Sequence, residues 1–354
     1  MRRAVFYGEE VIKLEESPEP SVRPGWAKMK VAYCAVCGSE VNLFSKPRFT
    51  QALPHPVFGQ MGPFALGHEC AGVITEVGEG VTWVKAGDRV AVQPIVGCGE
   101  CFYCKKGLSN LCEKGYALMG SAFDGGMADY ICMPAENYYI IPDDMTLEAA
   151  SLVQCGAVSF GSVINSGLTM GSTALVIGVG TIGLMTVQAC QAAGASLIIA
   201  CDLEPHKLAY AKELGATHIV NGKEEDLRAV VKKLTDGLGV DFVYECAGAP
   251  STVADAVACV RKEGTIMMES VFYDKVPLPG IAFLQSEARI MTAVSPFTHN
   301  YAFMVDLAYR GKMTSDKLIT QRCQLEDVAQ AIRNLKLLPE QMKIMIEVDP
   351  SLGK

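Results

Sequence analysis

No charged residue and no histidine occurs between Ala149 and Cys201. A stretch so poor in charge could be a membrane span, which needs about 20 consecutive, mostly apolar residues. Here, however, Gln154, Asn165, Gln188 and many Gly, Ser and Thr residues interrupt the apolar runs. The strands of a parallel sheet that is buried on both faces are equally poor in charge. We therefore predict a buried parallel sheet in this stretch and not a membrane span.

The chain also lacks a surplus of basic residues. Its 31 Lys and Arg are outnumbered by 39 Asp and Glu, which gives a net charge of -8 at pH 7 and argues against a nucleic-acid partner. The N-terminal segment MRRAVFYGEEV has no long apolar run, so we expect no signal peptide and a cytoplasmic protein. There is no internal repeat and no low-complexity segment. A chain of 354 residues suggests two domains.

The segment ALVIGVGTIGLMTVQACQAAGASLIIACD, residues 174–202, is predicted to form a strand, a glycine turn, a helix and a second strand. In such a unit Gly178 permits the tight turn, Gly180 lets the backbone approach a pyrophosphate, and Gly183 lets the helix pack closely on the strand. The N-terminus of the helix offers N–H groups to the phosphates, and Asp202 is placed to accept hydrogen bonds from the adenosine ribose. We expect NAD to bind here, and the candidate residues are Gly178, Gly180, Thr181, Ile182, Gly183, Asp202 and Lys207.

Two patterns of secondary structure divide the chain. The first ~150 residues are predicted to be mostly strands and turns. From about residue 157 strands alternate with helices, which is typical of a doubly wound parallel sheet with right-handed crossovers and gives an α/β fold. The expected elements of this second part are strands at 217–220, 240–245 and 265–268, and helices at 207–214, before 234 and at 251–262. Helices at 301–310 and 325–335 precede a last strand at 343–348, which could return to the first domain.

Four of the 14 cysteines cluster as C-x2-C-x2-C-x7-C. Without a secretion signal, cysteines are expected to be thiols, and a tight cluster favours a metal over disulfides. Four thiolates can surround one tetrahedral zinc and leave no open position, which predicts a structural site. Metal-free buried cysteines and a redox pair are the alternatives, and the acidic net charge disfavours a zinc ribbon for nucleic acid. The four predicted ligands are Cys98, Cys101, Cys104 and Cys112.

Several motifs make the chain similar to the zinc-dependent medium-chain dehydrogenases over nearly its whole length. Within that family it most resembles the butanediol and polyol (sorbitol-like) dehydrogenases. The resemblance implies a mainly β, GroES-like catalytic domain at 1–156 with a structural-zinc lobe at about 94–115. It further implies a Rossmann domain at 157–293, a C-terminal part at 294–354 that returns to the catalytic domain, and a homodimer or homotetramer. The motifs are Cys37-Gly38-Ser39, Gly67-His68-Glu69 followed by Ala71-Gly72, Gly87-Asp88-Arg89-Val90, Pro54-His55-Pro56 and Pro94-Ile95-Val96-Gly97-Cys98.

The same resemblance implies a second, catalytic zinc held by Cys37, His68 and Cys155. Many polyol and butanediol enzymes have a glutamate where this chain has Cys155, whereas classical alcohol dehydrogenases have a cysteine there. Spacing alone does not show that the three residues converge, and an isolated histidine is more often structural than a ligand. Glu69 is either a fourth ligand or an acid that lies behind the ligands.

For the proton released in alcohol oxidation, the resemblance implies transfer through Ser39 to a ribose hydroxyl. A histidine that often completes this relay is replaced by Asn42, which does not titrate, and the aspartate beside the serine is replaced by Glu40. His55 is an alternative base or a wall of the pocket.

The chain is therefore expected to transfer hydride between NAD and a secondary alcohol, vicinal diol or polyol. The expected catalytic residues are Ser39, His68 and Glu69, and two zinc ions per chain are expected. A non-enzymatic nucleotide-binding protein of the same fold is the alternative, although such proteins usually lose the zinc ligands.

Overall fold

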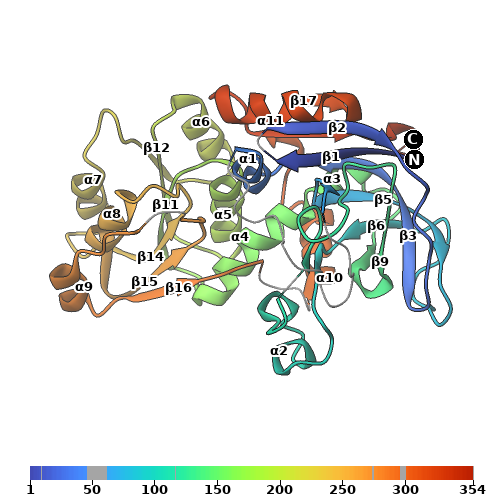
Figure 1. Ribbon diagram of the computed structural model, residues 1–354. Helices are drawn as coiled ribbons and strands as arrows, with labels where there is room; N and C mark the ends of the chain where they lie inside the picture. The colour runs from blue at the N-terminus through green and yellow to red at the C-terminus, as the bar shows by residue number, and fades with distance from the viewer. Residues whose placement is uncertain (9, 46–61, 116, 273–274, 296–299, 354) are drawn as a thin grey trace. The chain divides into compact units, whose positions relative to one another are not determined.

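The computed structural model describes residues 1–8, 10–45, 62–115, 117–272, 275–295 and 300–353. The chain forms two compact units (Figure 1): unit 1 comprises Met1–Gln154 with Phe297–Lys354, and unit 2 comprises Cys155–Pro296. His55 and the Pro54-His55-Pro56 motif lie outside the described residues.

Unit 1 is built mainly on antiparallel strands, and only β17 and β18 pair in parallel among the described strands of its sheets. β1 and β2 form an N-terminal hairpin, and β1 also pairs antiparallel with β4, so that one sheet has the order β2-β1-β4. The larger sheet has the order β10-β6-β5-β3-β18-β17, and β9 also pairs with β3. The strands of the two sheets are β1 (Arg2–Gly8), β2 (Val11–Glu16), β3 (Trp26–Ala35), β4 (Phe64–Ala65), β5 (Glu69–Val77), β6 (Arg89–Val92), β9 (Tyr130–Pro134), β10 (Tyr138–Ile140), β17 (Ile319–Gln324) and β18 (Lys343–Glu347).

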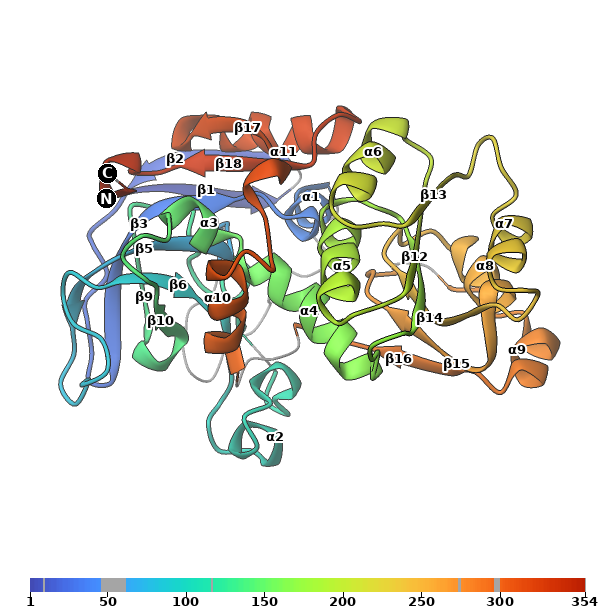
Figure 2. The same cartoon turned by 180° about the vertical axis from the view of Figure 1, so that it is seen from behind.

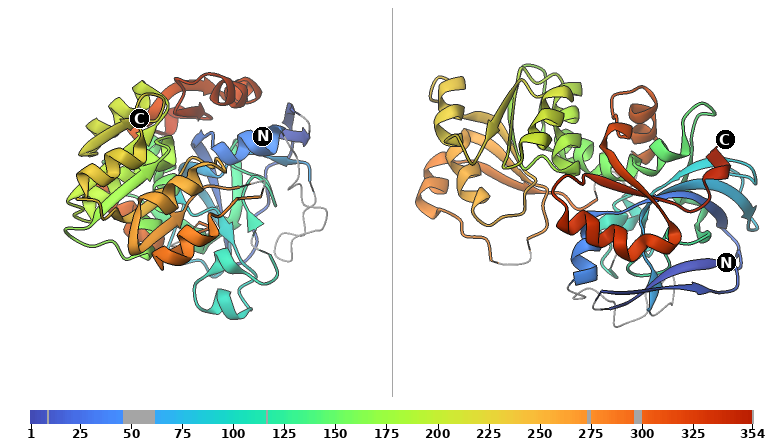
Figure 3. Two further views of the ribbon diagram at one scale, coloured as in Figure 1. Left: turned by 90° about the vertical axis from the view of Figure 1, so that its left-hand side faces the viewer. Right: turned by 90° about the horizontal axis from the view of Figure 1, so that it is seen from above.

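The C-terminal strand β18 lies beside strands from the start of the chain. It pairs antiparallel with β3, where Met345 faces Ala35 and Glu347 faces Tyr33. The red ribbon of β17 and β18 accordingly lies against blue strands in Figures 2 and 3. The side chains of Ile344 and Ile346 are fully buried in the core of this unit, which offsets the entropy of joining the two chain ends.

Helices and a small lobe complete unit 1. The lobe carries a short hairpin of β7 (Ile95–Val96) and β8 (Ala117–Leu118). Helix α4 (Val153–Ser166) begins at the end of unit 1 and continues into unit 2. The other helices are α1 (Gly38–Ser45), α2 (Phe102–Lys105), α3 (Leu147–Ser151), α10 (Tyr301–Tyr309) and α11 (Val328–Leu337).

Unit 2 is a parallel sheet with the strand order β13-β12-β11-β14-β15-β16. Helices α5 and α6 lie on one side of the sheet, and α7 and α8 on the other (Figures 1 and 2). The predicted doubly wound α/β fold is therefore confirmed. The strands are β11 (Thr173–Ile177), β12 (Leu197–Asp202), β13 (His218–Asn221), β14 (Val240–Glu245), β15 (Val260–Met268) and β16 (Arg289–Thr292), and the helices are α5 (Thr181–Ala192), α6 (Pro205–Glu213), α7 (Leu227–Leu234), α8 (Thr252–Cys259) and α9 (Gly280–Ser286).

The strand order of unit 2 reverses between β11 and β14. From β11 the chain proceeds to β12 and β13 in one direction, and it later proceeds from β14 to β15 and β16 in the other. A dinucleotide binds at the carboxyl ends of the strands on either side of such a reversal. The charge-free stretch forms α4, β11, α5 and most of β12, as predicted for a buried sheet. Among the described residues, none of the helices combines the length and apolarity that crossing a bilayer requires.

The prediction for residues 251–262 is wrong at its C-terminal end. Helix α8 stops at Cys259, and Val260 already has extended dihedral angles (φ -71°, ψ 141°). Val260 pairs with Val240 at the start of β14, so the sheet and not the local helical pattern decides its conformation. The register then shifts before Thr265, which pairs with Phe242. Tertiary pairing here overrides helix propensity.

Gly183 is the sharpest steric constraint in the turn between β11 and α5. A Cβ atom at this position would overlap the carbonyl oxygen of Gly178. We predict that Gly183→Ala lowers the free energy of unfolding by about 1–3 kcal/mol, the usual cost of overpacking. Gly180→Ala is the matched control, because a Cβ there has no neighbour within 4 Å and φ is -70°. Equal stability of the two variants in thermal unfolding would contradict this explanation.

Candidate functional site

The four lobe cysteines come together in unit 1. The Sγ atoms of Cys98, Cys101, Cys104 and Cys112 all lie within 4.8 Å of one another. Backbone N–H groups point at the sulfurs: that of Cys101 at Cys98 Sγ (3.4 Å), that of Cys104 at Cys101 Sγ (3.5 Å) and that of Cys98 at Cys112 Sγ (3.3 Å). Donors of this kind stabilise thiolates, which are the form that binds a metal.

The thiol pKa values differ within the cluster. Backbone N–H groups lower the pKa of Cys98, and they lower that of Cys101 to about 6. Burial raises the pKa of Cys104 to about 12 and also raises that of Cys112. The protein alone therefore stabilises part of the cluster as thiolates, and a cation is needed to stabilise all four. Four sulfur donors with this spacing fit a closed, tetrahedral zinc site.

A second group of donor atoms lies where β3 leads into α1 and where β5 begins. Ligand atoms of Cys37, His68 and Glu69 lie within 4.8 Å of one another. Cys37 is half-buried, whereas His68 and Glu69 are buried. The β3–β5 pairing, which places Ala35 opposite Glu69, brings the two motifs to the same end of the sheet.

Glu40 holds two of these residues in position. Its carboxylate accepts a hydrogen bond from the backbone N–H of Cys37 (2.8 Å), and its other oxygen lies 3.1 Å from His68 Nδ1. Because a carboxylate accepts, Nδ1 carries a hydrogen, and Nε2 would bind a metal in exchange for its own proton. Burial alone would lower the pKa of His68, but the charges of Cys37 and Glu40 raise it well above its ordinary value. The glutamate that replaces the expected aspartate thus orients both donors.

Lys343, which the sequence analysis missed, neutralises Glu69. Its Nζ atom lies 2.6 and 2.9 Å from the two carboxylate oxygens of Glu69 and 3.3 Å from the carbonyl oxygen of Val36. Both side chains of the ion pair are almost completely buried. The sequence does contain a signal, since Lys343 opens the segment KIMIEV, in which the next three residues are apolar.

The other expected residues of this site are placed as follows. Ser39 is exposed on α1, and Asn42 on the same helix donates a hydrogen bond to the carbonyl oxygen of Gly38 (3.2 Å). Cys155 is buried in α4 and belongs to unit 2, whereas the other proposed ligands belong to unit 1. Its role as a zinc ligand stays a prediction.

Unit 2 has a cavity of about 710 Å³ at the carboxyl ends of β11, β12 and β14. Its volume lies within the range of about 300–1,000 Å³ that is typical of ligand sites. Gly178, Gly180, Asp202 and Lys207, four of the residues expected to bind a nucleotide, line it, and Cys246 contributes on the β14 side. Further acids around it are Glu204, Glu225, Asp226 and Asp255.

Asp202 also supports the glycine turn. One carboxylate oxygen accepts the N–H of Val179 (2.8 Å), and the other accepts the N–H groups of Leu203 (2.8 Å) and Glu204 (3.0 Å). Thr181 and Ile182 form the first turn of α5, beyond the N-cap Gly180. The acid and the phosphate-binding turn are therefore linked before any ligand enters.

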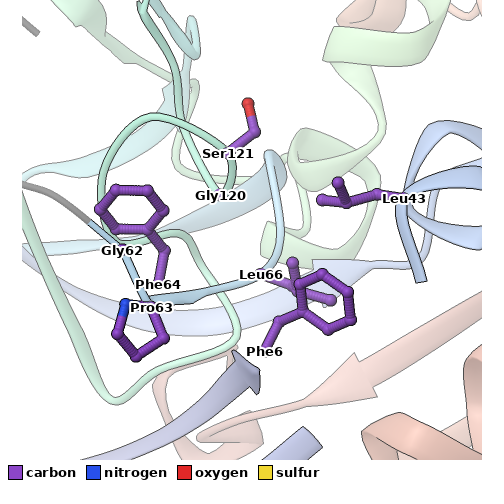
Figure 4. A pocket seen from close by; sticks show the side chains of 8 residues that line it. All are labelled: Phe6, Leu43, Gly62, Pro63, Phe64, Leu66, Gly120 and Ser121. Atoms are coloured by element: carbon purple, nitrogen blue, oxygen red, sulfur yellow. The ribbon is translucent and has the colours of Figure 1, made fainter. Parts of the chain in front are cut away.

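A small cavity in unit 1 does not fit a substrate. It measures about 40 Å³ and is lined mainly by carbon atoms of Phe6, Phe64 and Leu66, as Figure 4 shows. Its volume is far below the ~300 Å³ minimum that is usual for a ligand site. We interpret it as a packing gap.

Comparisons with known proteins agree with this geometry. Residues 23–143 match the alcohol dehydrogenase GroES-like domain, and residues 181–309 match the zinc-binding dehydrogenase domain. Sorbitol dehydrogenase of Bacillus subtilis is 34% identical over 348 residues, which cover 98% of this chain and 97% of that protein. The chain belongs to the zinc-dependent medium-chain alcohol and polyol dehydrogenases, and it is an enzyme of that class.

Solved structures show the same fold. The crystal structure of 2R,3R-butanediol dehydrogenase from B. subtilis superposes with a TM-score of 0.91 at 30% identity and covers 98% of this chain and 99% of its own. A zinc-binding dehydrogenase from Sinorhizobium meliloti, solved with NADP, gives a TM-score of 0.88 at 27% identity with the same coverage. The fold of this family therefore accepts a nicotinamide cofactor.

The lobe cluster generates the first prediction of this site. Because the binding energy of a structural zinc is folding energy, Cys101→Ser is expected to destabilise unit 1 by about 4 kcal/mol or more. Turnover per folded molecule should change much less. Thermal unfolding, zinc content and activity of the folded fraction check this, and a stable variant that has lost its chemistry would contradict it.

The contacts of Glu40 lead to the second prediction for this site. Glu40→Gln removes the negative charge that faces His68, and we predict that the variant binds zinc at the Cys37–His68 site about 10–100-fold more weakly. Glu40→Asp keeps the charge on a shorter side chain and should lose less. Competition with a chelator measures the affinity, and equal retention of zinc by the wild type and Glu40→Gln would disprove the orienting role.

Proposed function

We propose that this enzyme transfers hydride between NAD and a secondary alcohol, vicinal diol or polyol, and that it holds two zinc ions. The observation that carries this proposal is the donor pair Cys37 and His68, which Glu40 orients and beside which Lys343 cancels the charge of Glu69. A thiolate and an oriented imidazole at one end of a sheet fit a catalytic zinc site that keeps an open position.

Cys37 and His68 fit a zinc ion, and we propose Cys155 as its third ligand from the resemblance in sequence. Two thiolates would balance the charge of the ion, and the His68 imidazole would add none. Glu69 would make the site anionic, but its ion pair with Lys343 removes that charge. We therefore assign Glu69 to the supporting residues behind the ligands. Bound zinc supplies polarisation of a hydroxyl or carbonyl oxygen and lowers the pKa of the hydroxyl.

NAD is the proposed cofactor because the adenosine end of the cavity is acidic. Asp202 is placed to accept ribose hydroxyls, and a 2′-phosphate would be repelled by Asp202 and by Glu225, which lines the same cavity. Lys207 softens this repulsion, while Lys223 is already paired with Glu204 (2.9 Å). The NADP-bound relative shows that the fold does not decide between the two cofactors, so the choice rests on these side chains.

The proposed substrate class follows from the relatives. Sorbitol and 2R,3R-butanediol both carry neighbouring hydroxyl groups on secondary carbons, and the proteins named for them align over almost the whole chain. An assembly of two or four copies is part of the proposal, since β16 leaves an exposed edge on the sheet of unit 2. Size-exclusion chromatography with light scattering tests that part.

A panel of substrates tests the function as a whole. The purified, zinc-loaded protein is assayed with butanediols, sorbitol and other polyols, simple secondary alcohols and acyloins, each with NAD and with NADP, and NAD(P)H is followed by absorbance. Oxidation of at least one diol or polyol with NAD is expected. Turnover with NADP alone would overturn the cofactor assignment, and oxidation of primary alcohols only would overturn the substrate class.

Asp202 generates a prediction about cofactor preference. Asp202→Ser is expected to lower the ratio of NAD affinity to NADP affinity by at least about tenfold, or about 1.4 kcal/mol. The variant also loses the acceptor for the Val179 N–H, so the affinities for both cofactors should fall and only their ratio is informative. A wild-type enzyme that prefers NADPH would contradict the assignment outright.

Ser39 generates a prediction about the proton. If its hydroxyl passes the proton to a ribose hydroxyl, Ser39→Ala should slow alcohol oxidation near neutral pH by up to about 10²–10⁴-fold, with little change in NAD affinity. Asn42→Ala should matter less, because an amide can hydrogen-bond, as it does here to the Gly38 carbonyl, but cannot take up the proton. Asn42→His should raise the rate if a base is missing there. An unchanged rate in Ser39→Ala would mean that the proton leaves by another path. His55→Ala would then be the next variant to measure.

A further inference from the structure

Two glutamates stand at neighbouring strand ends of unit 2. Glu245 is the last residue of β14, and Glu269 directly follows β15. These strands lie on the opposite side of the strand-order reversal from Asp202 at the end of β12. A dinucleotide with its adenosine at Asp202 and its pyrophosphate at the glycine turn extends its nicotinamide half toward β14 and β15. This placement rests on the proposed function, in which NAD is the cofactor.

Glu245 is well supplied with hydrogen-bond donors. Its carboxylate accepts the N–H groups of Ala247 and Gly248, both at 3.0 Å, and lies 2.7 Å from the hydroxyl of Thr252, for whose single hydrogen it competes with the carbonyl oxygen of Ala249 (2.6 Å). Donors arranged in this way stabilise a charged carboxylate in the turn after β14.

Glu269 is poorly supplied in comparison. Its Oε2 atom lies 2.8 Å from Thr186 Oγ1 and 3.6 Å from Cys246 Sγ. The Thr186 hydroxyl also lies 3.0 Å from the carbonyl oxygen of Ile182, and its single hydrogen cannot serve both acceptors. Among the described residues, the buried Oε1 atom of Glu269 has no hydrogen-bond partner.

These surroundings favour a neutral carboxyl. Burial, with the nearby charge of Glu245, raises the pKa of Glu269 to about 8, although the polar side chains of Thr186, Cys246 and Ser162 offset part of the rise. The other titratable groups that face it are Tyr244 on β14, Cys246 after that strand and Cys190 on α5. Burial raises the pKa of each of these three, so they stay neutral while Glu269 titrates.

The cluster borders the nucleotide cavity. Cys246, which lies 3.6 Å from Glu269, lines that cavity on its β14 side. A nicotinamide ring that lies against Cys246 would therefore be separated from the Glu269 carboxyl by little more than that side chain. Across such a short, dry distance the electrostatic interaction is strong.

We propose that Glu269 couples proton release to the oxidation state of the cofactor: it gives up its proton when the cationic nicotinamide of NAD⁺ binds and keeps it beside the neutral ring of NADH. The step forms a carboxylate and a proton that passes to solvent, and no other bond changes. Glu269 acts through the electric field that its carboxylate creates at the nicotinamide ring. It is therefore a positioning residue and not a catalytic one.

The direction of the pH dependence follows. At low pH the carboxyl is protonated in every state, and it does not distinguish NAD⁺ from NADH. At a pH above 8 the carboxylate is present before binding and attracts the cation. If the cation lowers the pKa of Glu269 by about one unit, NAD⁺ affinity relative to NADH rises about tenfold between the two limits. Between them, NAD⁺ binding releases a fraction of a proton, which for a shift of one unit is about half a proton at most.

Calorimetric titration of the zinc-loaded enzyme tests this. NAD⁺, NADH and ADP-ribose are each titrated in buffers of different ionisation enthalpy, at pH values on either side of 8, and the proton count is extracted. Proton release is expected with NAD⁺ and not with NADH or ADP-ribose. Infrared difference spectra should show the loss of a protonated carboxyl band on NAD⁺ binding.

Variants assign the proton to its source. Glu269→Gln keeps the shape of the neutral carboxyl and should abolish its share of the proton release, the infrared band and the rise in the affinity ratio. Thr186→Val removes a donor, which raises the pKa of Glu269 and should move the release to higher pH even if Glu269→Gln folds poorly. Glu225→Gln, at the adenosine end of the cavity, should change NAD⁺ and NADH affinity equally.

The failure of this inference is distinct from failure of the proposed function. If the wild type binds NAD⁺ and NADH, and Glu269→Gln shows the same proton release and the same pH dependence, Glu269 has no such role while the function stands. If the wild type binds neither cofactor, the proposed function itself fails.

Discussion

The buried ion pair between Lys343 and Glu69 is the interaction on which the metal-binding end of unit 1 depends. Isolated burial of either charge would cost several kcal/mol, and the pair repays that cost only because its geometry is good and Lys343 also reaches the Val36 carbonyl. The pair requires β18 to lie beside β3, and the end of β3 leads directly to Cys37. The burial of Glu69 beside these donors therefore depends on a strand from the other end of the sequence.

Most of the fold could be predicted because its signals are local. Alternating burial defines β3, and the glycine turn with Asp202 defines the start of unit 2. The four lobe cysteines are close in sequence, so their convergence needed no tertiary information. The end of α8 was mispredicted because the conformation of Val260 is set by its pairing with Val240 on β14. A prediction from neighbouring residues alone does not include that pairing.

The supporting residues of the site could not be predicted in the same way. Glu40 could be identified as a replacement, but its simultaneous contact with Cys37 and His68 depends on how α1 leaves β3. Lys343 and Glu69 are far apart in the sequence, so their ion pair has no local signal. Glu269 differs from Glu245 in its hydrogen-bond donors, and this difference is visible only in the structure. In each case a polar side chain depends on partners from other elements, which composition and spacing do not encode.

The pairing of β18 with β3 also has a consequence for biosynthesis. A chain that emerges from the ribosome exposes β3, β5 and the Cys37–His68 donors long before β18 is made. During that interval Glu69 lacks the lysine that makes its burial tolerable. All residues of unit 2 lie between β5 and β18 in the sequence. Unit 2 can therefore fold before the last strand of the unit 1 sheet has been synthesised. A nascent chain that stops short of Lys343 would carry a complete nucleotide fold beside an unfinished metal site.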